Sequence, residues 1–381
     1  MSELHIDKTH WKKYRFDEVC RQVNEATKDP VADGLDHVVG LEHIEPNNLH
    51  ITQWDTLEKE TTFTRKFKKG QVLFGRRRAY QRKVAYAEFD GICSGDILVF
   101  EAVEEVLLPE LLPFLIQSEG FFQKALATSA GSLSPRTKFK ELADYEFLLP
   151  PKAEQKRLAE LLWAADEVVE KEKRERDILQ NQIQIYINEN CNAIGQPKIP
   201  FSDLVDVNPT TKFDENEVSL ITMPDVSEEG EIMHQEKAVT SDYKNKGLTP
   251  FQENDILFAK ITPCMENGKG AIARGLINGW GLGSTEFHVL RPKTASDLYF
   301  CYYLTMSKRF RKLAEKQMTG SAGQKRVQVE FFDFYKLCAP SKDERKMIGD
   351  RLFKMDCSIS ALKQQIFMSQ QIKQELINKI F

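Results

Sequence analysis

Two long stretches of the chain carry apolar residues at the spacing of a helix face. In the second stretch the seam alternates in steps of three and four residues, which is the a/d pattern of a helix that packs against another helix. This seam consists of Ile348, Leu352, Met355, Ile359, Leu362, Ile366, Ser369, Lys373, Leu376 and Ile380. The corresponding seam of the first stretch consists of Leu158, Leu162, Ala165, Val169, Glu172, Arg176, Leu179, Ile183, Tyr186 and Asn190. The pattern predicts two long helices, from about residue 154 to 193 and from 343 to 381.

The two predicted helices are expected to pack against each other. Neither contains proline, and Pro151 and Pro340 stand just ahead of them, as is common where helices start. A helix of ~40 residues is ~60 Å long, so one small domain would not bury its whole seam. Polar seam residues such as Glu172 and Lys373 would then fix the register of the pair. The alternative is two amphipathic helices that each pack only on their own domain.

The chain is an internal repeat. The segment Pro150–Arg157 recurs in altered form as Ala339–Lys346, half a chain later. Three further segments recur in the same order: Phe16–Asn24 as Phe201–Asn208, Gly70–Arg76 as Asn254–Lys260, and Thr128–Arg136 as Met318–Arg326. Such self-similarity indicates duplication of one structural unit. We therefore predict a first domain at 1–150, a first helix at 151–195, a second domain at 196–340 and a second helix at 341–381.

Within the first domain, short apolar runs alternate with turns. Gly70–Phe74, Ile97–Phe100 and Glu146–Leu149 are predicted strands, and residues 107–126 carry apolar residues at helical spacing. The mixture of short strands and helices predicts an α/β (α+β) fold in each domain.

Composition is that of an ordinary globular protein. The chain has 381 residues, of which 41% are hydrophobic and 29% charged, enough for two or three domains. No apolar run approaches the length of a membrane span, and the polar N-terminal stretch does not resemble a signal peptide, so we expect a cytoplasmic protein. The seven scattered cysteines lack any CxxC pair and are predicted to be buried thiols without a metal or disulfide role.

Charge is unevenly distributed along the chain. The net charge of −4 by itself argues against nucleic-acid binding, but nine Lys and Arg residues lie between Arg65 and Lys83 without an acidic residue among them. Arginine can grip guanine or phosphate with two parallel hydrogen bonds, and Tyr80 and Gln81 add a stacking ring and an amide suited to adenine. The segment Arg76–Lys83 is therefore a predicted DNA contact; the alternative is a solvated basic edge that touches nothing.

The second domain differs from the first mainly in this loop. In place of the basic segment it has Lys260–Gly270, which contains Thr262, Asn267 and Lys269. A shared scaffold with different loop residues is what two domains that recognise different short DNA sequences would need. The alternative is drift between repeats without functional meaning.

Motifs for catalysis were not found in the sequence. It contains no adenine-methylase NPPY or DPPY motif, no glycine-rich cofactor loop after a strand, no nucleotide-binding phosphate loop and no nuclease core around Pro224-Asp225. We therefore expect the chain to be non-catalytic.

Together with the duplicated order, four motifs resemble the specificity subunit of a Type I restriction–modification system over nearly the whole chain: Leu149–Gln155, Gly75–Gln81, Ile261–Lys269 and Gly283–Phe287. The resemblance implies two target-recognition domains with twisted sheets, separated by two long helices packed as an antiparallel coiled coil. An approximate two-fold axis would make the recognised DNA site bipartite, and the unlike domains would make it asymmetric. One departure is Arg345, which stands where the first copy has Gln155.

The resemblance also implies partners and site residues. The partners would be double-stranded DNA, two methyltransferase subunits and two restriction/translocase subunits; this chain would need no cofactor, whereas its partners would use S-adenosylmethionine, ATP and Mg. DNA contacts are expected at Arg76, Arg77, Arg78, Tyr80, Gln81, Arg82, Lys83, Ser94, Ser132, Ser134, Arg136, Lys260, Thr262, Asn267, Lys269, Ser284, Glu286, Ser321, Gln324, Lys325 and Arg326. Partner contacts are expected at Glu154, Gln155, Arg157, Glu344 and Arg345.

Two other functions compete with a DNA-recognition subunit. A stand-alone DNA-modifying enzyme would methylate or cut DNA without partners. A coiled-coil scaffold would be indifferent to replacement of Arg76, Arg77 and Arg78 by alanine, whereas a DNA-recognition subunit would lose DNA binding.

Overall fold

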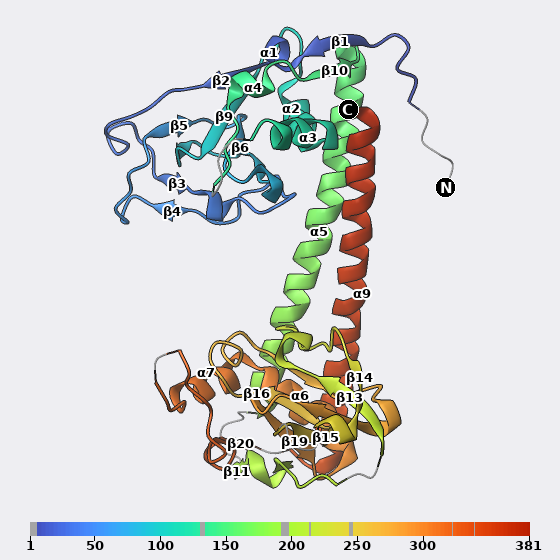
Figure 1. Cartoon of the computed structure of the whole chain (residues 1–381). Helices are drawn as coiled ribbons and strands as arrows, with labels where there is room; N and C mark the ends of the chain where they lie inside the picture. Colours follow the sequence, from blue (N-terminus) through green and yellow to red (C-terminus); the bar gives the residue numbers. More distant parts are fainter. Residues whose placement is uncertain are drawn as a thin grey trace. The chain divides into compact units, whose positions relative to one another are not determined.

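The computed structural model describes residues 6–129, 134–191, 198–212, 215–243, 247–321, 323–338 and 340–381. The chain divides into two compact units (Figure 1): unit 1 consists of Met1–Glu172 and Gln364–Phe381, and unit 2 of Lys173–Lys363. Two long helices, α5 (Lys152–Cys191) and α9 (Lys342–Ile380), contribute residues to both units. Among the described residues, no helix is long and apolar enough to cross a membrane.

Two four-stranded sheets form the body of unit 1. Their strands are β2 (Cys20–Val23), β3 (His37–Val39), β4 (Asp55–Thr56), β5 (Arg65–Phe67), β6 (Val72–Gly75), β7 (Val84–Tyr86), β8 (Gly91–Cys93) and β9 (Ile97–Ala102). One sheet is antiparallel with the order β2-β9-β6-β7, and the other has the order β4-β3-β8-β5 with β3 and β8 parallel. Strand β6 is buried along its whole length, as expected for a central strand with an uninterrupted apolar sequence.

Short helices and one strand pair complete unit 1. These are α1 (Phe16–Val19), α2 (Leu112–Gln117), α3 (Glu119–Ala127) and α4 (Phe139–Leu142), with β1 (Lys12–Arg15) paired antiparallel to β10 (Glu146–Leu149). The rings of Phe16, Phe100 and Phe121 meet in a core that also includes Leu162 of α5 and Ile377 of α9. The sheets, short helices and long-helix segments of unit 1 thus share one core.

Unit 2 repeats this architecture. Its strands are β11 (Lys198–Pro200), β12 (Val205–Val207), β13 (Glu217–Ile221), β14 (Glu236–Val239), β15 (Thr249–Gln252), β16 (Ile256–Ala259), β17 (Gly270–Ile272), β18 (Trp280–Gly283), β19 (Phe287–Pro292) and β20 (Lys336–Cys338). Its short helices are α6 (Leu298–Met306), α7 (Lys308–Lys316) and α8 (Phe331–Phe334). The sheets have the orders β12-β19-β16-β17 and β14-β13-β18-β15, with β13 and β18 parallel, and β11 pairs with β20. The predicted duplication of an α/β fold is confirmed.

The start of one short helix shows how closely the two units match. Ser118 caps α3 by accepting a hydrogen bond from the backbone N–H of Phe121, and Ser307 caps α7 by accepting one from Phe310, both at 3.3 Å. A serine at this position satisfies one of the N–H groups that a helix start leaves without a partner.

The two long helices pack against each other within unit 1. Asp166 of α5 binds Lys373 of α9. Further along α5, Glu172 accepts hydrogen bonds from Gln365 and Ser369 of α9. Residue numbers rise along α5 as they fall along α9, so the pair is antiparallel, as predicted. The alternative of helices that each pack only on their own domain is wrong.

The same helices also meet in unit 2, where the guanidinium of Arg351 lies over the ring of Tyr186 at 4.7 Å. None of the twenty predicted seam residues, all of them described, is exposed. The polar seam residues Glu172 and Lys373 are only 7% and 4% exposed and are hydrogen-bonded across the helix pair. Such pairing resists a register shift, because a shift would leave buried polar groups without partners.

The cysteine prediction is correct for most positions. Cys20, Cys93, Cys191, Cys301 and Cys338 are buried. Cys264 is only partly buried and Cys357 is exposed, so for these two the prediction is wrong. Cys357 lies on α9 beside the seam rather than in it, because Ile359 and Met355 occupy the inward positions.

Candidate nucleic-acid interface

The loop after β6 presents a small part of the predicted basic segment to solvent. Arg78 and Arg82 both have left-handed backbone conformations, with φ of 55° and 53°, on either side of a single helical turn. The buried methyl group of Ala79 anchors this turn, and Tyr80 is 57% exposed. The tight turn therefore directs Arg78 and Tyr80 outward while its centre is fixed to the core.

Three of the predicted DNA-binding residues in this loop are used inside unit 1. Arg77 binds the carboxylate of Asp96 and the hydroxyl of Ser134. Arg82 pairs with Glu119 and stacks over the ring of Phe122. The ammonium group of Lys83 donates to the backbone oxygen of Leu41. These three side chains stabilise the loop and are poorly placed to release their partners for DNA.

Arg76, Arg78, Tyr80 and Gln81 remain free to bind an external group. Their side chains make no hydrogen bond or ion pair within the described residues. The Nε of Arg76 is buried without a partner, and burial together with the nearby charge of Arg65 lowers the pKa of its guanidinium. An arginine held beside other cations is electrostatically suited to an anion such as phosphate or to guanine.

The corresponding loop in unit 2 is held by different contacts. Thr262 donates to Glu266, Asn267 donates to Glu228, and Lys269 donates to the backbone oxygen of Met223. These three predicted DNA-binding residues therefore have partners inside unit 2. The side chains of Lys260, Gln324, Lys325 and Ser321 make no hydrogen bond or ion pair within the described part of the chain and form the corresponding free set.

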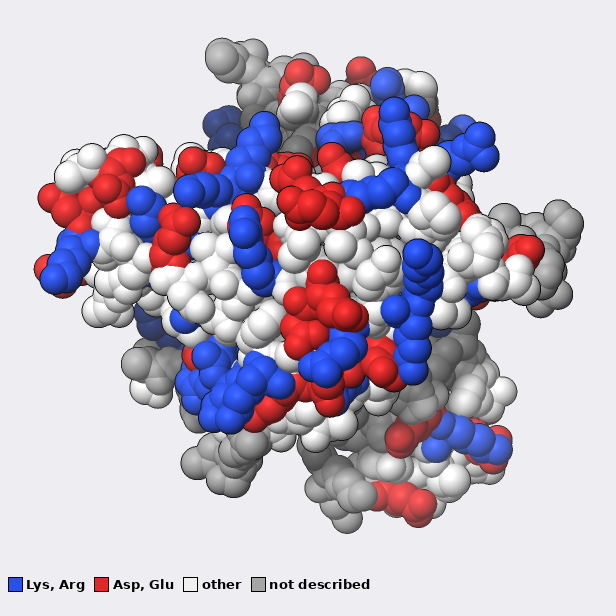
Figure 2. Space-filling model, turned by 90° about the horizontal axis from the view of Figure 1, so that it is seen from above, with Lys and Arg blue, Asp and Glu red and all other residues white. Residues whose placement is uncertain are grey.

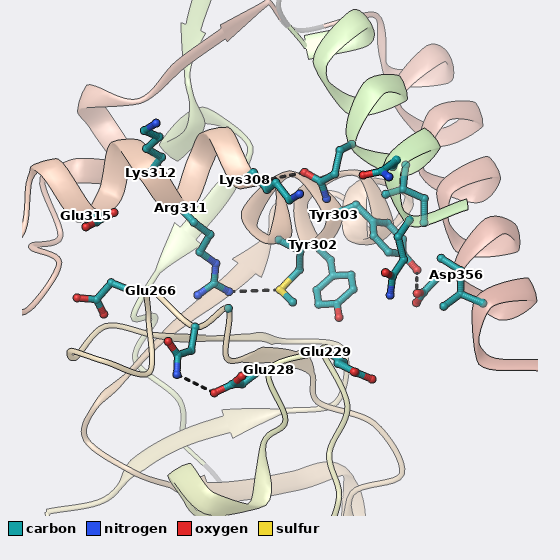
Figure 3. Close-up of a pocket in the computed structure, with 18 of the residues that line it drawn as sticks. Glu228, Glu229, Glu266, Tyr302, Tyr303, Lys308, Arg311, Lys312, Glu315 and Asp356 are labelled. Atoms are coloured by element: carbon teal, nitrogen blue, oxygen red, sulfur yellow. Dashed lines mark hydrogen bonds between the residues drawn. The ribbon is translucent and has the colours of Figure 1, made fainter. Parts of the chain in front are cut away.

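A buried arginine binds the backbone of the loop that follows β16 in unit 2. Arg311 of α7 is 7% exposed and donates to the backbone oxygens of Met265 and Lys269, at 3.0 and 3.1 Å. Burial lowers the pKa of its guanidinium to about 9, so it still carries its charge at neutral pH. It borders a cavity of about 550 Å³ whose lining includes side chains of both charge signs (Figure 3), among them Glu228, Lys308 and Lys312.

Two predicted serines shape turns rather than face solvent freely. The hydroxyl of Ser94 accepts a hydrogen bond from the backbone N–H of Asp96, and that of Ser284 accepts one from Glu286. Ser132 lies outside the described residues. Arg136 and Arg326, expected to contact DNA, are paired with Asp96 and Glu286, and Glu286 therefore serves as an internal acceptor.

The predicted partner-binding residues are also divided between internal and external roles. Gln155 is 1% exposed and binds the backbone of Leu108, Val106 and Pro150. Arg345, its counterpart, binds the backbone oxygen of Pro340 and the buried carboxylate of Asp297. Both side chains bind the backbone oxygen of the proline five residues earlier and a segment more than 40 residues earlier. Because both fasten the start of a long helix in this way, Arg345 can replace Gln155.

The other three residues of this group lie nearer the surface. Glu154 accepts hydrogen bonds from Trp11 and pairs with His10. Glu344 caps α9 through reciprocal bonds with Ser341, and its exposed side chain remains accessible. Arg157 is exposed as well. A partner-binding surface at the helix starts therefore stays a prediction for Glu154, Arg157 and Glu344. Gln155 and Arg345 are engaged inside their own units.

Unit 1 contains a partly buried charged group that the sequence pattern does not predict. His50 Nε2 lies 2.7 Å from Asp166, whose other oxygen accepts from Lys373 at 2.8 Å, and His50 Nδ1 lies 2.9 Å from Glu88. The hydrogen bond to Asp166 raises the pKa of His50 to about 9, so the ring is protonated at neutral pH. Lys373 on the predicted seam was a signal for this group, but nothing in the sequence pointed to His50.

Charge is mixed rather than separated on one face of the molecule. Figure 2 shows Lys and Arg interspersed with Asp and Glu over the visible face. A face with mixed charge offers phosphates little sequence-independent attraction. Within the described ranges, no cluster of three or more His, Cys, Asp or Glu residues is suited to hold a metal ion.

The chain is similar to known proteins over both of its halves. The family model of the Type I restriction modification DNA specificity domain matches residues 8–181 and 193–374. The chain is 36% identical over 190 residues to the Type I restriction enzyme EcoEI specificity subunit and 40% identical over 187 residues to the EcoAI specificity subunit, both of Escherichia coli. These alignments cover 49% and 48% of this chain but only 32% and 30% of the relatives, so each matched region spans about a third of the curated protein.

The fold is similar to that of a solved structure. The S subunit of a Type I restriction-modification system from M. genitalium aligns with 99% of this chain and 98% of its own length, with a TM-score of 0.54 at 13% identity. At this identity the likeness concerns the fold alone. Because the family model covers both halves of the repeat, the chain belongs to the family of Type I restriction modification DNA specificity domains.

Proposed function

We propose that this chain is the DNA-recognition subunit of a Type I restriction–modification complex and binds a bipartite, asymmetric DNA site. The observation that carries this proposal is that two units with the same fold differ in the side chains that have no partner among the described residues. In unit 1 these side chains follow β6, whereas in unit 2 only Lys260 follows β16 and the others lie in the segment Met318–Arg326. Arg76, Arg78, Tyr80 and Gln81 would bind one half-site, and Lys260, Ser321, Gln324 and Lys325 the other. Different loops on one scaffold give different base preferences because base-edge contacts carry sequence information.

In this proposal the chain itself does no chemistry. Two methyltransferase subunits would transfer methyl groups to adenine, and two restriction/translocase subunits would cut, with S-adenosylmethionine, ATP and Mg as their cofactors. The helix starts, with Arg157, Glu154 and Glu344 near the surface, are the proposed docking positions. The repeat offers two similar faces, which favours two copies of the methyltransferase subunit. The complex would act on DNA in the cytoplasm.

The test is a genome-wide map of methylated adenines in cells that contain the partner subunits with or without this chain. We expect methylation at one bipartite asymmetric sequence only when the chain is present. Arg78→Ala and Tyr80→Ala should relax base preference in one half-site, whereas Lys28→Ala, which removes an exposed charge elsewhere in unit 1, should not. Methylation or cleavage by the purified chain alone would contradict the non-catalytic assignment.

We also propose that the paired helices set the number of unrecognised base pairs between the half-sites. The support is that α5 and α9 each contribute residues to both units. Insertion of one heptad into both helices should lengthen the gap and leave both half-sites unchanged, because seven residues preserve the seam. A methylation map with the original gap would refute this role.

A further inference from the structure

Each unit has an acid–arginine pair at the same place, beside the loop that follows β6 or β16. We call these two loops, together with the segments that they contact at the pair, the recognition loops. In unit 1, Arg136 donates from Nε to Asp96 Oδ1 at 2.7 Å and from Nη2 to Oδ2 at 3.3 Å. In unit 2, Arg326 donates from Nε to Glu286 Oε2 at 3.0 Å and from Nη2 to Oε1 at 2.8 Å. Both arginines follow their acid by 40 residues. We call these two ion pairs the loop clamps.

The backbone around each clamp is bonded in the same pattern. In unit 1 the backbone N–H of Arg76 donates to the oxygen of Asp96, and Thr137 donates to the oxygen of Arg76. In unit 2 Lys260 donates to Glu286, and Val327 donates to Lys260. These backbone bonds hold the residue that follows β6 or β16 next to the clamp. In both units this residue, Arg76 or Lys260, is a cation whose side chain makes no hydrogen bond or ion pair among the described residues.

A second pair of backbone bonds extends the pattern. Arg78 donates to the backbone oxygen of Pro135 at 2.9 Å, and Thr262 donates to that of Lys325 at 3.0 Å. Residues 77 and 136 form an antiparallel bridge, as do residues 261 and 326. The two loops thus share their supporting bonds even though their exposed side chains differ.

The clamp arginines are better suited to position the loop than to contact bases. Their Nε and Nη2 donors, which form the planar fork that binds a carboxylate or guanine bidentately, are already engaged by the acid. A carboxylate freed from its arginine would repel phosphate. The pairs are partly exposed, with 43% and 38% of the arginine side chains accessible, so they contribute little to global stability. Their recurrence in both loops therefore requires a local reason.

We propose that Asp96–Arg136 and Glu286–Arg326 are positioning pairs that hold the recognition loops in their DNA-binding shape, each for its own half-site. This inference rests on the proposed function. It predicts that both members of a pair matter, because the acid is needed as well as the arginine. In unit 1 Asp96 also accepts from Arg77, so loss of Asp96 should cost at least as much preference as loss of Arg136. If Arg136 or Arg326 contacted a base directly, removal of the acid would instead release the arginine and leave binding intact or stronger.

The experiment is selection of bound sequences from a random double-stranded DNA library by the complex of full-length chain and methyltransferase subunits. The wild type should yield two preferred half-sites. Asp96→Asn and Arg136→Ala should each reduce preference by about tenfold per base pair in one and the same half-site, and the double variant should be no worse than Asp96→Asn alone. Glu286→Gln and Arg326→Ala should do the same in the other half-site.

Exchange of the two charges provides the decisive variant. Glu286→Arg combined with Arg326→Glu should recover part of the lost preference, which a direct base contact would not allow. Unit 2 is the better place for this exchange, because Asp96 in unit 1 also pairs with Arg77. The matched control is Glu217→Ala, which breaks the surface pair with Lys237 in the same unit and should leave both half-sites unchanged. Thermal unfolding of every variant verifies that it is folded.

The outcomes separate this inference from the proposed function. Absence of any preferred sequence with wild-type chain would contradict the proposed function itself. A normal wild-type result with full preference in Asp96→Asn and loss at a single base pair in Arg136→Ala would make Arg136 a base-contacting residue and overturn the positioning role. Loss of preference in both half-sites from a single clamp variant would also overturn it, because each clamp belongs to one unit.

Discussion

Asp166 in unit 1 and Asp356 in unit 2 occupy matching positions on the two long helices, but their surroundings shift their pKa values in opposite directions. Burial alone would raise the pKa of Asp166, but His50 and Lys373 outweigh it and lower the pKa below its usual value. Burial raises the pKa of Asp356, and the hydroxyl of Tyr303 at 2.8 Å and the charge of Lys363 offset this only in part. The same residue is thus stabilised as a carboxylate by two cationic side chains in unit 1, whereas in unit 2 burial disfavours its ionised form.

The difference shows that the two units share a backbone fold but pair equivalent polar side chains with different partners. The helix starts show the same divergence, because Gln155 in unit 1 binds only backbone whereas Arg345 in unit 2 requires the carboxylate of Asp297. At Asp166 and Asp356 the residue is the same and only its neighbours differ, whereas at the helix starts the exchange of Gln155 for Arg345 is accompanied by a different neighbour. The matched pairs can therefore be tested by substitutions that should have unequal effects in the two units.

The largest effect is expected for Asp166→Ala. It leaves the ammonium group of Lys373, which is 4% exposed, without its partner, and loss of one member of a buried ion pair typically costs about 3–5 kcal/mol of the free energy of unfolding. Hydrogen exchange measured by mass spectrometry should show faster exchange in unit 1 and little change in unit 2. Unchanged protection of unit 1 would contradict the assigned role of Asp166.

A slightly smaller loss is expected for Arg345→Gln. The substitution strands the buried carboxylate of Asp297 and should reduce the free energy of unfolding of unit 2 by about 3 kcal/mol. Leu108 in unit 1 and Asp297 in unit 2 both precede the first residue of a helical segment, and Leu108 contacts Gln155. Arg345→Gln combined with Asp297→Leu therefore restores the residue pair of the first copy. Urea unfolding should place the double variant within about 1 kcal/mol of wild type; additive losses would refute the matched exchange.

The two units should also respond to pH in opposite directions. The pKa of His50 is about 9 in the fold, above its usual value of 6.5, so its stabilisation of unit 1 is complete below pH 6.5 and is lost as pH rises through 9. Burial lowers the pKa of His288 to about 4, so unit 2 loses stability as pH falls from 6.5 to 4. Each effect is at most about 3 kcal/mol.

Hydrogen exchange across pH 4–10, corrected for the intrinsic rate, measures the opposite responses. His50→Gln should abolish the alkaline loss in unit 1 and leave the acid loss in unit 2, and His288→Gln should do the reverse. A common response of both units would show that the histidines do not control it.

The smallest effect is expected for Asp356→Asn. Because the pKa of this carboxyl is raised in the fold, its ionised form costs free energy at neutral pH, and the cost disappears as pH falls through the raised pKa. An amide oxygen can still accept the hydrogen bond from Tyr303, so the substitution should stabilise unit 2 by about 0.5–1 kcal/mol. The matching Asp166→Asn should destabilise unit 1, and destabilisation by both would remove the contrast.

The sequence by itself determined the architecture. The three- and four-residue spacing of the seam predicted two paired helices, because one small domain would not bury an apolar stripe of that length. Repetition of four segments in order required two similar units. The apolar run before Arg76 required a buried strand followed by a loop, and this is where β6 ends.

Only the tertiary structure decided which side chains of the loops are engaged by partners within their unit. Arg77, Arg82 and Lys83 are as basic as Arg76 and Arg78, but their partners Asp96, Glu119 and Leu41 come from distant parts of the chain. Gln155 is likewise buried by a loop more than 40 residues earlier. Periodicity records which face of an element turns inward, whereas the pairing of individual polar groups depends on contacts between segments that sequence spacing does not specify.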